Sequence, residues 1–149
     1  MELRLRNVEA GDLALFFAHQ QDPEAAAMAA FASRDKPAFV EHWAKLLRDD
    51  TSLKQTIVVD EKVAGNIGSW NSHGNREVGY WIDRELWGRG VATGALSAFL
   101  RLEQTRPLYA GVAKHNAASL RVLQRCGFTF DADAEPEDAN DTHFLLVLK

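Results

Sequence analysis

The sequence predicts an α/β (α+β) fold, in which helices pack on both faces of a mixed β-sheet. Two patterns in the spacing of apolar residues in the middle of the chain indicate this fold. Val78, Tyr80 and Ile82 alternate with the residues between them, at the period of two that a strand requires. From Val91 the apolar residues recur at helical spacing, and residues 108–113 alternate again. A strand, a helix and a second strand in this order imply a parallel crossover.

The residues before position 76 divide into strands and helices by the same two periods. Leu3, Leu5 and Val8 face one side of a first strand, and Asp12 is expected to cap the helix that follows. The other expected elements are an alanine-rich helix over 24–31, a helix from Pro37 to about residues 49–50, strands over 56–59 and 63–70, and a polar turn over 71–75.

The second half of the chain continues this alternation. The helix that starts at Val91 must end before Pro107, and strand 108–113 follows it. Asn116 is a good N-cap for the next helix, and Gly127 suits the left-handed position that ends it. The last two expected strands cover residues 128–132 and 142–149, on either side of an acidic loop over 133–141.

Length and composition predict a single soluble domain over residues 1–149. The chain has 46% hydrophobic and 26% charged residues, which is ordinary for a globular protein. No apolar run approaches the roughly 20 residues that span a bilayer, and the N-terminus lacks the apolar region of a secretory signal. The single cysteine cannot form an internal disulfide. We therefore expect a cytoplasmic protein that is not bound to a membrane.

The formal net charge of −4 bears on the partners of the chain. Binding to nucleic acid depends on clustered Lys and Arg, so this charge argues against it and mildly favours a cationic substrate. Metal binding is not expected either, because the five histidines do not show the spacing of metal ligands. The sequence leaves open whether the protein is a monomer or a homodimer.

Two glycines, Gly88 and Gly90, separate the central strand from the helix that follows it. They allow a sharp turn and let the backbone N–H groups approach a ligand closely. Together with the free amides and the dipole at the helix start, such a turn favours a phosphate or diphosphate. A dinucleotide-binding site is disfavoured, because its fingerprint would need glycine where Thr93 stands. A P-loop is disfavoured as well, because it would need a Gly-Lys pair, which the chain lacks.

The turn Trp87-Gly88-Arg89-Gly90-Val91-Ala92 resembles the diphosphate-binding turn of the GNAT superfamily of N-acetyltransferases, Gln/Arg-x-x-Gly-x-Gly/Ala. Trp87 stands where Gln or Arg is usual. The longer form Trp-Gly-Arg-Gly-Val-Ala-Thr, preceded by Gly-Tyr-Trp, is similar to the branch that acetylates ribosomal-protein N-termini and small amines. A second segment, from Asn116 to Gly127-Phe128, resembles the later motif of the family.

The resemblance implies a GNAT-like, mostly antiparallel sheet of about seven strands, and transfer of acetyl from acetyl-CoA to a primary amine by direct attack. The early helices would line the acceptor groove. The pantetheine arm of the cofactor would pair with backbone groups near Trp81 and Ile82, where two strands diverge. The residues implied in cofactor binding are Trp81, Ile82, Trp87, Gly88, Arg89, Gly90, Val91, Ala92, Thr93, Asn116 and Ser119.

Two catalytic roles follow from the same resemblance. Glu77, at the start of the central strand, is the expected general base, with a chain of water molecules as the alternative. Many members of the family place a tyrosine acid seven residues after the asparagine, and here that position is Leu123. Ser119 is expected to position the thiol sulfur or a water, or only to complete the first turn of its helix. Cys126, at a helix C-terminus, is expected to be structural.

Two further interpretations stay open at this point. The missing tyrosine and the departure at Trp87 are compatible with a non-catalytic coenzyme A-binding sensor or interaction module of the same fold. A different acyl donor, or an oxygen acceptor, would use the same turn.

Overall fold

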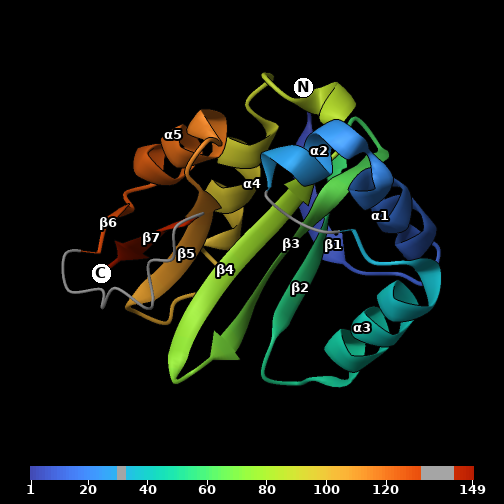
Figure 1. Cartoon of the computed structure of the whole chain (residues 1–149), viewed down its shortest axis with the longest axis horizontal. Helices are drawn as coiled ribbons and strands as arrows, with labels where there is room; N and C mark the ends of the chain where they lie inside the picture. The colour runs from blue at the N-terminus through green and yellow to red at the C-terminus, as the bar shows by residue number, and fades with distance from the viewer. Residues whose placement is uncertain (30–32, 132–142) are drawn as a thin grey trace.

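The structure is a computed structural model that describes residues 1–29, 33–131 and 143–149. Its described strands form one seven-stranded sheet in the order β1-β2-β3-β4-β5-β7-β6 (Figure 1). The strands are β1 Leu3–Asn7, β2 Leu53–Val59, β3 Lys62–Ser72, β4 Asn75–Ile82, β5 Leu108–Ala113, β6 Thr129–Phe130 and β7 His143–Leu148. Only β4 and β5 pair in parallel, so the predicted mixed, mostly antiparallel sheet is confirmed.

Helices cover both faces of this sheet. They are α1 Asp12–Gln21, α2 Pro23–Met28, α3 Lys36–Arg48, α4 Val91–Phe99 and α5 Ala117–Arg125, with a short 3₁₀ helix, η1, over Arg84–Leu86. The main core lies between the strands and the pair α4 and α5, and it includes Val78, Ile82 and Leu96. A smaller cluster of Phe16 and Trp43 with their neighbours joins α1 and α3 to the opposite face. Helices on both faces are therefore confirmed.

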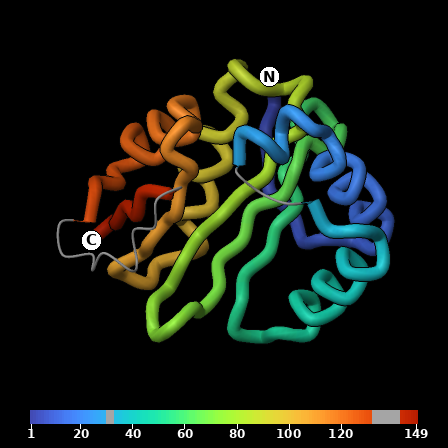
Figure 2. The backbone as a smooth tube through the Cα atoms, in the orientation of Figure 1, coloured from blue at the N-terminus to red at the C-terminus, as the bar shows by residue number. Residues whose placement is uncertain are grey.

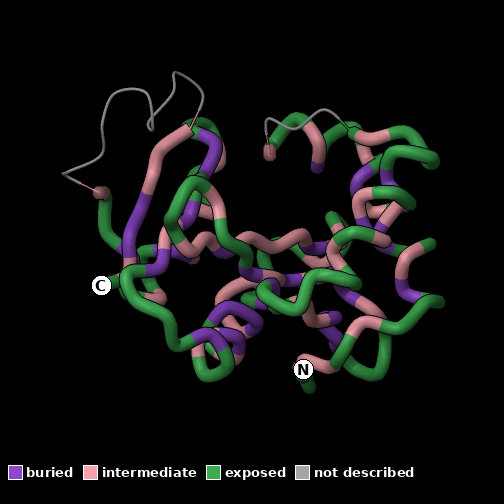
Figure 3. Tube along the Cα trace, turned by 90° about the horizontal axis from the view of Figure 1, so that it is seen from below, coloured by how far each residue is buried: buried purple, intermediate pink, exposed green. Residues whose placement is uncertain are grey.

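The chain folds as two halves that meet along β4 and β5. Figure 2 shows the first half, from blue to green, on one side of this junction and the orange and red segments on the other. Buried segments run through the strands and the inward turns of the helices, while exposed residues lie on loops and outer turns (Figure 3). At this junction β4 and β5 are joined by two residue pairs only, so the sheet opens there.

The N-terminus of α1 differs from the sequence prediction. Asp12 is not the N-cap; that position belongs to Gly11, and no side chain caps the helix. Asp12 is 4% exposed, and its carboxylate accepts two hydrogen bonds from Arg6, at 2.7 and 2.9 Å. It also accepts from the Thr56 hydroxyl at 2.7 Å and the Glu9 N–H at 2.9 Å. The guanidinium on β1 draws this carboxylate inward, where it joins three segments instead of capping one.

Two other boundaries also differ. The segment 71–75 is not a long turn, because β3 and β4 pair almost to its centre and only His73 and Gly74 connect them. Both have positive φ, 49° and 84°, which defines the type I′ turn that matches the twist of paired strands. The strand expected over 128–132 is only Thr129–Phe130, since Phe128 is turned into the core.

Some expectations fall on residues outside the described ranges. These are the end of the helix expected over 24–31, the acidic loop over 133–141, and the outer ends of the last two strands at positions 132 and 142.

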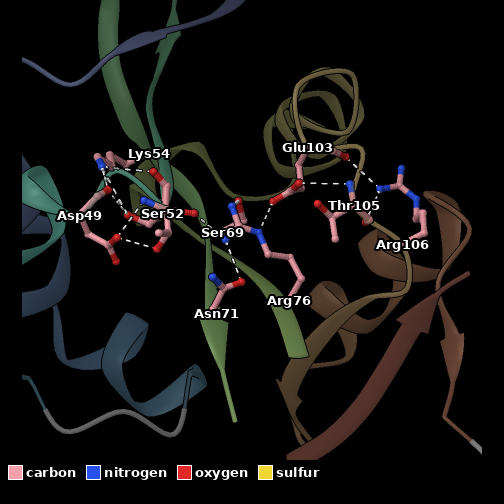
Figure 4. A network of polar contacts seen from close by, with 10 residues as sticks. Asp49, Ser52, Lys54, Ser69, Asn71, Arg76, Glu103, Thr105 and Arg106 are labelled. Carbon is pink, nitrogen blue, oxygen red and sulfur yellow. Dashed lines mark hydrogen bonds and ion pairs between the residues drawn. The ribbon is translucent and has the colours of Figure 1, made fainter. Parts of the chain in front are cut away.

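A polar network holds the closed end of the junction (Figure 4). Arg76, at the start of β4, donates to Glu103 at 2.5 Å, to the carbonyl of Thr51 at 2.7 Å and to the Ser69 hydroxyl at 3.2 Å. The side chains of Arg76 and Glu103 are 11% and 4% exposed. Burial alone would raise the pKa of Glu103, but hydrogen bonds from Ser69 and Arg76 outweigh it and lower that pKa. The start of β4 is therefore connected to three other segments: β3, the residues just before β2, and the segment that follows α4.

Candidate functional site

β4 and β5 separate soon after they meet. They pair only at Arg76 with Leu108 and at Glu77 with Tyr109, although both strands continue further. From Val78 onward β4 pairs with β3 on one side only. A cleft of about 500 Å³ occupies the gap, and residues of β4, β5, α2, α4 and α5 line it. The divergence expected at this place is confirmed, and it leaves one edge of β4 open to a ligand (Figure 1).

The glycine turn stands at the open end of this cleft. Gly88 and Gly90 both have positive φ, 77° and 79°, which explains why glycine is needed at each. A Cβ built on either would have no protein atom within 4 Å, so the backbone is bare on that side. Gly90 is the N-cap of α4 and no side chain caps the helix, so the amides of the first turn remain for an anion.

The remaining residues of the turn lie around this bare backbone. Val91, Ala92 and Thr93 line the cleft with the two glycines. Trp87 lines it too, and its Nε1 donates to the carbonyl of Ile82 at 3.1 Å. This carbonyl therefore already accepts one hydrogen bond within the protein. Arg89 is exposed and is not among the described residues that line the cleft.

The helix that begins at Asn116 borders the same cleft. The side chain of Asn116 accepts from the backbone N–H of Ser119 at 3.1 Å, so the predicted N-cap is confirmed. Gly127 has a φ of 97°, and the N–H of Phe128 donates to the carbonyl of Leu123 at 3.0 Å, as expected for the end of this helix. Leu123 is 2% exposed and apolar, so it supplies no acid.

Two arginines of α5 were not singled out by the sequence. Arg121 and Arg125 both line the cleft, and neither forms an ion pair within the described part of the chain. Their spacing of four residues places them on one face of the helix. This spacing was the only signal in the sequence that could have identified them.

A pair of hydroxyl groups was also missed. The Oη of Tyr80 lies 2.6 Å from the Oγ of Ser119, and both residues line the cleft. Burial raises the pKa of Tyr80 to about 12, an effect that its hydrogen bond to Ser119 opposes. The alternation of β4 places Tyr80 on the same face as Val78 and Ile82, but no pattern in the sequence shows that this face meets the start of α5.

Glu77 lies at the closed foot of the cleft. It is half-buried, is aligned with Trp70 of β3 and Tyr109 of β5, and is not among the described residues that line the cleft. Its neighbour Trp70 extends over Gly79, where an added Cβ would come within 2.8 Å of the indole. The general base predicted at Glu77 therefore lies one residue before Val78, where the unpaired edge of β4 begins.

The far side of the cleft is formed by α2. Ala25, Met28 and Ala29 line it, whereas no described residue of α1 or α3 does. The Nε2 of His115, which follows β5, lies 2.7 Å from the carbonyl of Ala27, so a hydrogen bond joins the two halves across the cleft. Of the early helices expected to line an acceptor groove, α2 has this position.

The described residues contain no group of three or more His, Cys, Asp or Glu side chains placed to hold a metal ion. None of the helices in the described ranges is long and apolar enough to cross a membrane.

Comparison of the sequence with known families gives one match. A family model described as an acetyltransferase (GNAT) domain matches residues 2–129. No match was found among curated protein sequences.

The fold is similar to that of several solved structures. Spermidine N-acetyltransferase from Vibrio cholerae, solved with CoA and spermine, has a TM-score of 0.80 at 18% identity, with 98% of this chain and 94% of that chain covered. An acetyltransferase from Thermus thermophilus has a TM-score of 0.79 at 21% identity, with 99% and 97% covered. RimJ from Mycobacterium smegmatis, in complex with CoA-disulfide, has a TM-score of 0.71 at 22% identity, with 98% and 81% covered. At these identities the likeness establishes the shared fold.

Proposed function

The chain belongs to the GNAT acetyltransferase family, and from this membership we propose that it transfers the acetyl group of acetyl-CoA to a primary amine, on a protein N-terminus or a small molecule. The observation that carries the proposal is the open edge of β4 beside the bare glycine turn. The edge offers backbone groups to the amides of pantetheine, and the turn offers N–H groups to the diphosphate. Family membership favours this enzyme over a non-catalytic coenzyme A-binding module.

In this arrangement the phosphates of the cofactor lie next to positively charged groups. The amides of Val91, Ala92 and Thr93 lie at the positive end of the α4 dipole. Arg121 and Arg125 on the neighbouring helix add two full charges that no ion pair in the described residues neutralises. We assign these two side chains, together with the exposed Arg89, to the phosphate groups of CoA.

The reaction needs a proton acceptor and a site for the developing oxyanion. The amine nitrogen attacks the thioester carbonyl, the C–S bond breaks as the tetrahedral intermediate collapses, and its electron pair goes to sulfur. We propose that a backbone N–H of the unpaired edge of β4 polarises the carbonyl oxygen. Because Glu77 lies at the foot of the cleft and not on its wall, we propose that it accepts the proton of the ammonium through water.

The α2 side of the cleft suggests the class of amine. Its walls are Ala25, Met28, Ala29 and Trp81, and no described residue lining the cleft is a carboxylate. A polyamine would carry further positive charges to walls on which the described residues offer no anionic partner, and burying an unpaired charge is costly. We therefore infer an acceptor with a single amino group on a neutral or apolar body.

A panel of amines tests this function. The purified chain is incubated with acetyl-CoA and either a peptide with an N-terminal alanine, an arylalkyl monoamine or spermidine, and release of free thiol is followed. We expect amine-dependent release, with kcat/KM for the better monoamine or peptide about tenfold or more above that for spermidine. Mass spectrometry of the product separates an N-acetyl amide from an ester or another acyl group.

Two results would contradict the proposal. Binding of CoA without thiol release from any amine would support the coenzyme A-binding module instead. Preferred turnover of spermidine would support the proposed acetyltransferase activity but refute the inferred class of acceptor.

A further inference from the structure

The pair formed by Tyr80 and Ser119 joins the two elements that border the opening of the cleft. Tyr80 belongs to β4 and Ser119 to the first turn of α5, thirty-nine positions later, and their hydroxyl oxygens are 2.6 Å apart. Both side chains are half-buried and line the cleft. A hydrogen bond of this length between two half-buried hydroxyls fixes the rotamer of each.

The proton count of the pair leaves one donor unused. Two hydroxyls carry two protons, and the bond between them uses one. Neither hydroxyl makes any other hydrogen bond within the described residues. The nearby Asn116 side chain accepts from the backbone N–H of Ser119 and not from its hydroxyl. One O–H group of the pair therefore remains available to a ligand in the cleft.

Either hydroxyl could donate to the other, and their chemistry favours one direction. Both are protonated at neutral pH, and a phenol is a stronger donor than an aliphatic hydroxyl. The favoured arrangement has Tyr80 donating to Ser119, which leaves the O–H of Ser119 free to point into the cleft.

We propose that Tyr80 is a positioning residue for acetyl transfer, which holds the Ser119 hydroxyl so that its O–H donates to the sulfur of the departing CoA thiolate. The inference rests on the proposed function and assigns Tyr80 to the support of Ser119, which the family resemblance already placed near the thiol sulfur and which the apolar Leu123 cannot replace. When the C–S bond breaks, its electron pair goes to sulfur, and the hydrogen bond from Ser119 stabilises the anion. The thiolate is then neutralised through water by the proton that the nitrogen gives up on becoming an amide. Neither hydroxyl loses its proton.

Steady-state kinetics of Tyr80→Phe and Ser119→Ala test the step. Each substitution is expected to lower kcat by about ten- to hundredfold, because hydrogen bonds to charged groups contribute that much, while the KM for acetyl-CoA changes little. The double variant should be no slower than the slower single variant, since both remove the same interaction. Ser119→Thr, which keeps the hydroxyl, should recover most of the activity.

Tyr109→Phe is the matched control. Tyr109 is the other tyrosine of the chain, is also half-buried and lies on β5 outside the described lining of the cleft. Its variant should keep the kcat of the unmodified protein. If Tyr80→Phe also keeps it, or changes only KM, or if the double variant shows the product of the two single effects, the positioning role is refuted.

A binding experiment separates failure of this inference from failure of the proposed function. CoA is bound to the unmodified protein and to both single variants, and its thiolate is titrated by ultraviolet absorbance, without any acceptor amine. A hydrogen bond from Ser119 should lower the pKa of the bound thiol, and both substitutions should raise it by a similar amount. An identical thiol pKa in all three proteins would overturn the inference, whatever the amine panel shows.

Discussion

At Gly90 the backbone takes a φ of 79° beside open space, so the proposed diphosphate site depends on the small size of this residue. Substitution Gly90→Ala adds a methyl group in front of the amides and strains the left-handed conformation. We expect the Kd for CoA, measured calorimetrically, to rise about tenfold or more, which corresponds to roughly 1.4 kcal/mol.

The chain offers a matched control for that substitution. Gly74 has a φ of 84°, also has nothing within 4 Å of its Cβ position, and lies in the β3–β4 turn outside the described lining of the cleft. Gly74→Ala should lower the melting temperature about as much as Gly90→Ala and leave the affinity for CoA unchanged. Equal losses of affinity in both variants would show that backbone strain, and not contact with the ligand, causes the effect.

At the scale of elements, the angle between β4 and β5 depends on what holds their closed end. Arg76 and Glu103 form a nearly buried ion pair there, with further hydrogen bonds to Thr51 and Ser69 (Figure 4). Arg76→Met would leave the Glu103 carboxylate buried without its cation. We expect a loss of about 3 kcal/mol in the free energy of unfolding, measured by urea denaturation.

A double-mutant cycle measures how much of this loss in the free energy of unfolding comes from the interaction of Arg76 with Glu103. Arg76→Met with Glu103→Leu should be more stable than Arg76→Met alone, because no charge is then left unpaired. The exposed pair of Arg4 and Glu61, with side chains 50% and 72% exposed, is the control and should show little coupling. A coupling as small at Arg76 as at Arg4 would mean that the network does not hold the junction.

For the whole molecule, Asp12 connects β1, the start of α1 and β2 through Arg6, Glu9 and Thr56. The hydrogen bond from Arg6, followed by those from Glu9 and Thr56, outweighs burial and lowers the pKa of Asp12 to about 2 from its usual 3.8. A lowered pKa contributes stability above the unfolded value, and that contribution is lost as the pH falls from about 3.8 toward 2. Its size at neutral pH is about 2 kcal/mol.

Substitution of this carboxylate gives a pH-dependent prediction. Asp12→Asn should lower the free energy of unfolding by about 2 kcal/mol at pH 7, and the difference from the unmodified protein should shrink as the pH falls through the range from 3.8 toward 2. Urea denaturation at a series of pH values measures it. Asp50→Asn, at an exposed position, is the control and should show no such trend. A difference that stays constant with pH would exclude the ionised carboxylate as its source.

The elements of the fold could largely be predicted from local patterns. The alternation of Val78, Tyr80 and Ile82 and the helical period from Val91 both depend on residues close in sequence, so they are readable without the structure. The same holds for the glycines of the turn and for the Asn116 cap, because their roles are set by backbone geometry within a few residues. Asp12 was mistaken for a cap because its partners, Arg6 and Thr56, lie in other elements.

By itself the sequence determined the order of strands and helices, the glycine turn proposed to bind an anion and the family to which the chain belongs, since each of these follows from short-range patterns. Only the tertiary structure decided at which residues β4 parts from β5, that Glu77 lies below the cleft, and that the hydroxyl of Tyr80 meets Ser119. These three facts concern groups on different elements, whose distances are set by how the sheet twists and opens and not by their separation along the chain.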